Sequence, residues 1–334
     1  MAEVKYSTLK DIRDIIGKVV KDHKETGIRR VFCVACGGSL SCFYPMTYLL
    51  RAEAKTFTCE SITSNEFVHA TPKGLGEDCV VFAMSLAGGT PETVAAAKTA
   101  KEAGATVVTL SSLYDVPLFA HGDYKVYYRI ETDNVIENVN QYVILALAFE
   151  LLQQAEGTEL YEDALDGLKK IPGVCRRALD QVHERAFRWG EKMKNVPMLY
   201  TMGSGPSYFV AYMQSICMFM EMEWINSGSI HTGEYFHGPF EITDKDQKFM
   251  VFVSEGRTRA LDERALKFLK TYAADANVEI VDVKEFGINS IADSVVEYFS
   301  PILHWVLGLE YAQGLAAAKE HPLMMRRYMY KVEY

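Results

Sequence analysis

The feature that most constrains the fold of this chain is a recurring pattern of short apolar runs, rich in β-branched and aromatic residues, that end in glycine- or serine-containing turns. Residues 31–36 (VFCVAC) and 79–85 (CVVFAMS) are two such runs, and a stretch with helical periodicity follows each turn. Strands that are apolar along their whole length and alternate with helices are typical of a parallel sheet covered on both faces. The sequence therefore predicts an α/β, doubly wound fold.

The same pattern returns in the second half of the chain. The turn glycine Gly203 follows Gly37 by 203 − 37 = 166 positions, and Ser254 follows Ser85 by 254 − 85 = 169 positions. Two strand-and-turn matches at nearly one offset indicate an internal duplication. We therefore expect two similar α/β domains, at residues 1–160 and 161–320, followed by a C-terminal tail at 321–334.

Length and composition agree with this organisation. A chain of 334 residues that is 49% hydrophobic and 24% charged suits a two-domain globular protein. The formal charge is 35 − 44 = −9 without a basic block, so we expect neither nucleic acid nor an anionic membrane as the main partner. Because no apolar run is long enough to span a membrane and the N-terminus has no apolar signal core, we predict a cytoplasmic protein.

Two cofactor motifs are incomplete in this chain. The seven scattered cysteines indicate reduced thiols, and the C-x-x-C pair Cys33 and Cys36 lies in a strand, where residues three apart point to opposite faces. Gly203-x-Gly205 follows a strand, but Tyr208 occupies the third glycine position of a dinucleotide fingerprint. We therefore predict no metal at the cysteine pair and no nicotinamide cofactor.

Residues 218–241 (MFMEMEWINSGSIHTGEYFHGPFE) contain a dense group of acid–base side chains. Glu221 is embedded in an apolar helical run, where its neighbours three, four and seven positions earlier are Met218, Cys217 and Gln214. These side chains solvate a charge poorly, so we predict a raised pKa for the Glu221 carboxyl. The alternative is that Glu221 lies on a solvated side of its helix.

Two histidines follow this helix. After a polar turn expected at residues 226–229 come His231 and then His237, which precedes Gly238 and Pro239, a pair that ends any helix or strand. A carboxylate and a histidine are the groups that general acid–base catalysis uses most often. A hydrogen-bonded loop histidine remains an alternative. The six-residue spacing of the histidines suits no common zinc motif, so we expect no metal.

Two turns in the first half have the features of an anion site. The turn GGS (37–39) follows the first strand, and LAGGTPET (86–93) follows the second. In the latter, Thr90, Pro91 and Glu92 are residues favoured at a helix start. A strand, a glycine turn and a helix start together present free backbone N–H groups and hydroxyls that can hold an anion. An ordinary tight turn would have the same sequence.

Taken in order, these motifs resemble those of the SIS (sugar isomerase) family, which binds sugar phosphates between two flavodoxin-like α/β domains. ACGGS (35–39) is similar to the C-G-T-S turn of that family, and SLAGGTPET (85–93) to its S-x-S-G-x-T phosphate loop. Ala87 replaces the middle serine, so we expect backbone amides to carry more of the phosphate binding. The resemblance implies phosphate contacts from the hydroxyls and glycine amides of both turns: Ser39, Ser85, Thr90, Gly38, Gly88 and Gly89.

A third motif is similar to the isomerase half of glucosamine 6-phosphate synthase. There a helical glutamate and a histidine before Gly-Pro serve proton transfer and ring opening, and Glu221 and His237 fall at similar positions. The resemblance implies that Glu221 is the base and that His237 is the acid, also available for ring opening. The chain begins MAE, without an N-terminal cysteine nucleophile, so we do not expect an ammonia-transferring synthase.

The tail HPLMMRRYM (321–329) and the two-domain arrangement resemble the fructosamine 6-phosphate deglycases, such as fructoselysine 6-phosphate deglycase. This resemblance implies cleavage of a 6-phosphorylated Amadori compound into glucose 6-phosphate and a free amino acid, without a metal or organic cofactor. It also implies a homodimer with the site at or near the subunit interface.

The sequence does not decide between several alternatives for the function. An aldose–ketose sugar-phosphate isomerase could use the same acid and base, and a non-catalytic sugar-phosphate sensor is a third possibility. The amino acid of the substrate, the subunit in which His237 acts and the role of Arg326 and Arg327 are not specified. Glu223 or Glu234 could receive a cationic lysine moiety; otherwise both are expected to be ordinary exposed acids.

Overall fold

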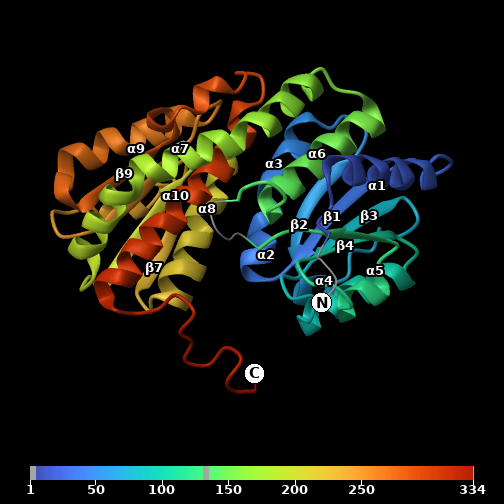
Figure 1. Cartoon of the computed structure of the whole chain (residues 1–334), viewed down its shortest axis with the longest axis horizontal. Helices are drawn as coiled ribbons and strands as arrows, with labels where there is room; N and C mark the ends of the chain where they lie inside the picture. Colours follow the sequence, from blue (N-terminus) through green and yellow to red (C-terminus); the bar gives the residue numbers. More distant parts are fainter. Residues whose placement is uncertain (1–4, 131–134, 334) are drawn as a thin grey trace. The chain divides into compact units, whose positions relative to one another are not determined.

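The described residues, 5–130 and 135–333, form two compact units in a computed structural model of the chain (Figure 1). Unit 1 comprises Met1–Leu168 and unit 2 comprises Lys169–Tyr334. The predicted boundary is at 160/161, whereas the units divide inside helix α7 (Tyr161–Met193). The start of the chain, MAE, lies outside the described residues.

Unit 1 contains a five-stranded parallel sheet with the order β2-β1-β3-β4-β5. Its strands are β1 (Arg30–Ala35), β2 (Thr58–Thr63), β3 (Cys79–Met84), β4 (Thr106–Ser111) and β5 (Tyr124–Tyr127). The chain moves from β1 to one edge through β2, then returns to place β3 on the other side of β1. The direction of winding therefore reverses between β1 and β3, as in other flavodoxin-like sheets.

Helices cover both faces of this sheet (Figure 1), which confirms the doubly wound α/β prediction. α1, α3 and α6 pack on one face, while α4 and α5 pack on the other around Phe32, Val81 and Ala97. α1 begins with a capping box between Thr8 and Asp11. The helices are α1 (Leu9–Asp22), α2 (Gly37–Cys42), α3 (Tyr44–Glu53), α4 (Ser64–His69), α5 (Pro91–Glu102), η1 (Pro117–His121) and α6 (Asn140–Glu156).

Unit 2 repeats this plan with a four-stranded parallel sheet of order β7-β6-β8-β9. Its strands are β6 (Met198–Gly203), β7 (Asn226–His231), β8 (Phe249–Val253) and β9 (Val278–Asp282). The order matches β2-β1-β3-β4, and the first residues of corresponding strands differ by 198 − 30 = 168, 226 − 58 = 168, 249 − 79 = 170 and 278 − 106 = 172. Topology and spacing therefore confirm the internal duplication.

The polar turn predicted at residues 226–229 is wrong, because these residues form most of β7. Each residue from Asn226 to His231 pairs with β6. Asn, Ser and Gly favour turns locally, but pairing with a central strand of the sheet overrides that preference. β7 is the edge strand, where polar side chains are tolerated.

The two crossovers that flank β7 lie on opposite faces of this sheet. The chain moves outward from β6 to β7 and back across β6 to β8, and right-handed crossovers in opposite directions cover opposite faces. α8 and η3 therefore lie with α10, and the 232–248 segment lies with α9. The helical elements are η2 (Gly205–Ser207), α8 (Tyr208–Met213), η3 (Gln214–Met222), η4 (Pro239–Ile242), α9 (Arg259–Tyr272), η5 (Asp275–Asn277), η6 (Val283–Phe286), η7 (Ile288–Ser290) and α10 (Val296–Lys319).

Two further features bear on the sequence predictions. All seven cysteines lie in described parts of the chain, and none of them forms a disulfide, as predicted. Among the described helices, none combines the length and apolar character needed to cross a membrane.

The contact between α7 and α10 depends on two glycines. A Cβ atom on Gly314 would lie 2.6 Å from the carbonyl oxygen of Ala186, and one on Gly190 would lie 2.4 Å from the carbonyl carbon of Gly314. Both neighbours are backbone atoms, which cannot move aside as a flexible side chain can. The two helix backbones therefore approach closely only because neither glycine carries a side chain.

We predict that Gly314→Ala lowers the free energy of unfolding by about 1–3 kcal/mol, because it forces these helices apart. Gly173→Ala is the control: Gly173 lies in α7, the helix that Gly314 of α10 packs against, but its Cβ would meet only the Arg177 side chain, at 3.4 Å. The control should keep or raise stability, since alanine is the better helix former. Urea unfolding followed by circular dichroism compares the two, and equal stability of both variants would contradict the prediction.

Candidate functional site

The two turns predicted to bind phosphate lie together at the carboxyl ends of the strands of the unit 1 sheet. β1 and β3 are parallel neighbours in register, so the segments that follow them leave from adjacent carboxyl ends. Ser39 follows β1, and Ser85 and Thr90 follow β3. The winding reverses between these two strands, and ligands of such sheets bind at the carboxyl ends beside this point.

The turn after β3 is rigid before any ligand arrives. Ser85, which is buried, shares a 2.9 Å hydrogen bond between its Oγ and Thr90 Oγ1, and the Thr90 N–H points to the same Ser85 oxygen at 3.4 Å. Gly88 has φ +65°, and a Cβ there would lie 2.2 Å from Cγ2 of Val116. The turn is thus fixed with its hydroxyls at the start of α5, where the helix dipole favours an anion.

The segment after β1 differs from the expected turn. Gly37, Gly38 and Ser39 form the first residues of α2 instead of a separate loop. Gly37 has φ +52°, a conformation that glycine adopts easily, and this allows the helix to begin directly after the strand. Gly38 and Ser39 are half-buried beyond the carboxyl end of β1, next to the turn after β3.

A buried hydroxyl network joins the strand ends beneath these turns. Thr93, in the first turn of α5, shares a 2.9 Å hydrogen bond with Ser64 and contacts the Cys36 sulfur at 4.0 Å. Thr93 follows β3, Ser64 follows β2 and Cys36 follows β1. The network is neutral, so it adds no negative charge below the predicted phosphate site.

Unit 2 has a carboxylate at the equivalent position. Asp262 corresponds to Thr93, because 262 − 169 = 93 is the offset that relates Ser254 to Ser85. Asp262 is fully buried and accepts hydrogen bonds from Thr232 Oγ1 at 2.7 Å and from the N–H and Oγ of Ser254, each at 3.2 Å. Burial raises the pKa of Asp262 to about 6, against the effect of these hydrogen bonds. This internal negative charge disfavours a phosphate in unit 2, whereas the unit 1 turns suit one.

Glu221 lies in the last turn of η3, which is a π-helix of nine residues. The wider turn carries hydrogen bonds over five positions, as in the 2.9 Å bond from the Glu223 N–H to the Met218 carbonyl. The α-helical spacing used to choose the neighbours of Glu221 therefore does not apply. π-helical turns are rare and often found at functional sites, and no sequence pattern predicted this one.

The side chain of Glu221 is 24% exposed and pairs with Arg326 of the C-terminal tail, whose Nη2 lies 2.8 Å from Glu221 Oε1. Burial raises the pKa of the Glu221 carboxyl, as predicted, while the Arg326 charge and hydrogen bond oppose this rise. Arg326 Nη1 also donates to the Met325 carbonyl at 2.9 Å. The tail thus contributes a buried cation that helps to keep Glu221 ionised.

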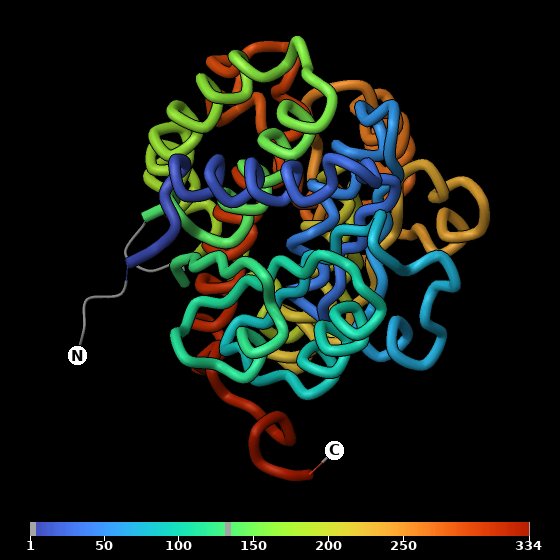
Figure 2. Tube along the Cα trace, turned by 90° about the vertical axis from the view of Figure 1, so that its right-hand side faces the viewer, coloured from blue at the N-terminus to red at the C-terminus, as the bar shows by residue number. Residues whose placement is uncertain are grey.

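Glu223 is fully buried, so the expectation of an exposed acid is wrong for this residue; Glu234 is exposed as expected. Lys319 Nζ, at the end of α10, lies 3.5 Å from Glu223 Oε2 and also donates to the Glu223 carbonyl. Burial raises the pKa of Glu223 to about 7, and Lys319 opposes the rise. The pair anchors the last residue of α10, from which the tail leaves (Figure 2).

His237 is exposed and lies on the other side of the unit 2 sheet from Glu221. It follows Phe236, which packs against Phe268 of α9 with ring centroids 5.6 Å apart. Glu221 ends the crossover that lies with α10, just before β7 begins, whereas His237 follows the carboxyl end of β7. These two residues are close along the sequence, but the fold places them on opposite faces of the unit 2 sheet.

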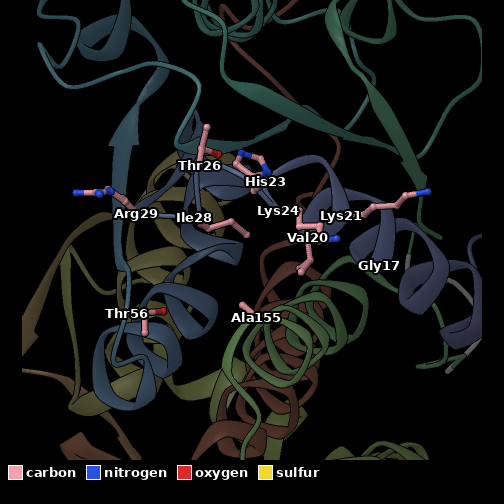
Figure 3. Close-up of a pocket in the computed structure, with 11 residues that line it drawn as sticks. Gly17, Val20, Lys21, His23, Lys24, Thr26, Ile28, Arg29, Thr56 and Ala155 are labelled. Atoms are coloured by element: carbon pink, nitrogen blue, oxygen red, sulfur yellow. The ribbon is translucent and has the colours of Figure 1, made fainter.

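A separate hollow in unit 1 lies beside the amino ends of β1 and β2 (Figure 3). It has a volume of about 710 Å³ and includes Val20, Ile28 and Ala155 in its lining. The charged ends of Lys21 and Arg29 extend away from the space between these three residues (Figure 3). This hollow contains none of the predicted site residues. In the described parts of the chain, no group of three or more His, Cys, Asp or Glu side chains is arranged to hold a metal ion.

Comparison with known proteins identifies the family. The model of the SIS domain matches residues 26–151. Fructosamine deglycase FrlB from Bacillus subtilis (strain 168) is 38% identical over 94% of this chain and 95% of its own length. This chain belongs to the SIS domain family. The recognition of SIS motifs in the sequence is therefore confirmed.

Other SIS relatives extend over nearly the same length. Fructoselysine 6-phosphate deglycase from Escherichia coli (strain K12) is 26% identical over 94% of this SIS protein and 89% of its own length. A crystal structure from Salmonella typhimurium LT2, provisionally described as a phosphosugar isomerase, has a TM-score of 0.92 at 42% identity and covers 98% of this chain and 99% of that one. The similarity thus includes both units of the SIS protein.

We predict that Arg326→Met raises the pKa of the Glu221 carboxyl, because burial remains while the opposing charge is lost. Arg326→Lys keeps a positive charge and should bring the pKa back towards the wild-type value. The measurement is a pH titration of the carboxyl ¹³C resonance of Glu221, identified by its absence in Glu221→Gln. An unchanged or lower pKa in Arg326→Met would show that the ion pair does not set the charge of Glu221.

Proposed function

We propose that this SIS protein is an enzyme, a deglycase that acts on a 6-phosphorylated Amadori compound and releases glucose 6-phosphate and a free amino acid. The observation that carries the proposal is 38% identity to a fructosamine deglycase over 94% of the chain. Glu221, a partly buried carboxylate kept charged by Arg326, supplies a base suited to the reaction. The fructoselysine 6-phosphate deglycase relative supports a phosphorylated substrate.

The chemistry begins with proton abstraction. In the open-chain ketosamine, Glu221 removes a proton from carbon 1, next to the carbonyl at carbon 2, while an acid protonates the carbonyl oxygen to give an enaminol. Protonation of carbon 2 then yields an imine between carbon 1 and the amine nitrogen. Water adds to carbon 1 and the amine leaves, which gives the aldose phosphate and the amino acid. No step requires a metal or an organic cofactor.

The phosphate is assigned to the unit 1 turns. Ser39, Ser85 and Thr90 supply hydroxyls, and Gly38, Gly88 and Gly89 supply backbone N–H groups at the carboxyl ends of β1 and β3. The fixed φ of Gly88 and the Ser85–Thr90 hydrogen bond support this assignment, because a preorganised site loses little entropy on binding. The neutral Thr93 network beneath the turns supports it further, in contrast to Asp262 in unit 2.

His237 is assigned as the acid and as the group that opens the sugar ring, acting in the site of a second subunit. The position of His237 supports this assignment, because His237 and Glu221 of one chain lie on opposite faces of the unit 2 sheet. In a homodimer, His237 of one subunit and Glu221 of the other can act on one substrate. We therefore propose a homodimer with its sites at or near the subunit interface. A cytoplasmic location stays a prediction.

A second candidate function is a simple aldose–ketose sugar-phosphate isomerase. The similarity to the Salmonella typhimurium structure, provisionally described as a phosphosugar isomerase, favours this candidate. Isomerisation uses the same proton abstraction but ends without a water-dependent loss of amine. Incubation with 6-phosphofructosyl-lysine and, separately, with fructose 6-phosphate distinguishes the two. A deglycase releases lysine and glucose 6-phosphate from the first substrate, whereas an isomerase converts only the second.

We predict that Glu221→Gln lowers kcat for 6-phosphofructosyl-lysine by about 100-fold or more with little change in KM, because glutamine keeps the shape but cannot accept the proton. Glu191→Gln is the matched control: Glu191 also pairs with a cation, Lys194 at 2.9 Å, but is exposed on α7. In heavy water the wild-type product should carry deuterium at carbon 2. A fully active Glu221→Gln enzyme would remove Glu221 from the mechanism.

A mixed dimer tests the assignment of His237. Glu221→Gln and His237→Asn should each be inactive alone, but a mixed dimer contains one site with both natural residues if His237 acts across the interface. Random reassembly of equal amounts makes half of the dimers mixed, so about a quarter of the wild-type activity should return. Mass spectrometry of the dimers shows whether subunits have exchanged. If they have exchanged and activity does not return, His237 does not act in the partner's site.

A further inference from the structure

A cavity of about 720 Å³ lies beside Glu221 in unit 2, between the end of η3 and the C-terminal tail. Glu221, Trp224 and Ile225 line it from the side of η3 and β7, and Arg326, Arg327 and Tyr328 line it from the tail. Its size is typical of small-molecule sites. None of the groups assigned to the phosphate lines it, because those groups belong to unit 1.

Trp224 forms a fixed aromatic wall of this cavity. Its φ of +55° is in the left-handed region, which is unusual for a bulky residue and is held only where the surroundings enforce it. The ring contacts His321 with centroids 4.4 Å apart, and the Arg327 guanidinium carbon lies 4.2 Å from its centroid. Residues held in this conformation cluster at active sites and ligand-binding positions.

The two neighbouring arginines of the tail differ in their partners. Arg326 is buried and pairs with Glu221, whereas Arg327 is exposed at the cavity, with its guanidinium plane held near Trp224. In residues 5–130 and 135–333, no carboxylate lies within ion-pair distance of Arg327. A guanidinium fixed on an aromatic ring keeps its N–H donors free for a planar anion, which a carboxylate matches with two parallel hydrogen bonds.

The position of the cavity beside Glu221 indicates which part of the substrate it receives. The proton assigned to Glu221 is on carbon 1, and the amine nitrogen is bonded to that same carbon. The amino-acid part therefore begins one bond from the reacting carbon, whereas the phosphate is at the far end of the sugar. A group that leaves carbon 1 on the side of Glu221 enters the space lined by Trp224 and Arg327.

We propose that this cavity binds the amino-acid part of the Amadori substrate and that Arg327, held against Trp224, pairs with its α-carboxylate. The inference rests on the proposed deglycase function and adds a specificity-determining residue to it. Met220 and Tyr328, both exposed at the cavity, supply apolar surface for the carbon chain of the amino acid. The enzyme thus selects substrates that carry a carboxylate close to the amine.

The test compares two substrates that differ only in this group: the 6-phosphofructosyl adducts of glycine and of methylamine. Both carry the phosphate and the same ketosamine, so a loss of phosphate binding affects them equally. Wild-type enzyme should prefer the glycine adduct by about tenfold or more in kcat/KM, as expected for a charge-assisted hydrogen-bonded pair. Arg327→Gln should remove most of this preference by lowering kcat/KM for the glycine adduct while leaving the methylamine adduct nearly unchanged.

Two variants serve as controls. Arg327→Lys keeps the charge but not the planar fork, and should retain part of the preference. Arg51→Gln removes an exposed arginine of α3 that lies 5.6 Å from the ring centroid of Tyr48 in unit 1, and should keep the full preference. The activity of Arg327→Gln on the methylamine adduct reports that Glu221 and the tail remain in place.

Three results would overturn the inference. An equal loss for both adducts would show that Arg327 serves the phosphate or the fold, and an unchanged preference in Arg327→Gln would show that the carboxylate binds elsewhere. A wild-type enzyme that prefers neither adduct would show that the carboxylate is not recognised. Wild-type enzyme that cleaves neither adduct would instead refute the proposed deglycase function, on which the inference rests.

Discussion

The parallel pairing of β1 with β3, and of β6 with β8, is the constraint on which the rest of this structure depends. Parallel strands need crossovers, and right-handed crossovers that start on either side of one strand must cover opposite faces of the sheet. The winding therefore reverses at these pairs, and the segments after their carboxyl ends leave the sheet toward opposite faces. In unit 1, Ser39, Ser85 and Thr90 therefore lie near one another at the carboxyl ends of β1 and β3.

The same constraint separates Glu221 and His237, the two catalytic residues predicted from the sequence. Glu221 and His237 are sixteen positions apart (237 − 221 = 16), yet β7 and its two crossovers place them on opposite faces of the unit 2 sheet. Proximity along the chain is thus a poor guide to proximity in space when a parallel strand intervenes. This separation supports the proposal that His237 acts in the site of a second copy of the chain.

The duplicated units differ in charge at a buried position beneath the corresponding turns. Thr93 and Asp262 both join strand ends through hydroxyl groups, with Ser64 as the partner in unit 1 and Thr232 in unit 2. A carboxylate satisfies more donors than a hydroxyl, which strengthens the unit 2 network, but its charge disfavours an anionic ligand. This difference in charge supports the proposal that unit 1, and not unit 2, binds the phosphate.

The sequence by itself determined the alternation of strands and helices, the duplication and the SIS motifs, because buried parallel strands and glycine turns are local patterns. It also indicated the raised pKa of Glu221, since an acid in an apolar helical run is poorly solvated. It did not reveal that residues 226–229 pair as β7, that η3 is a π-helix, or that Glu223 is buried. The pairing of Arg326 with Glu221 joins residues 326 − 221 = 105 positions apart. Only the tertiary structure decided these features, because strand pairing, helix widening and long-range ion pairs depend on neighbours that no local pattern specifies.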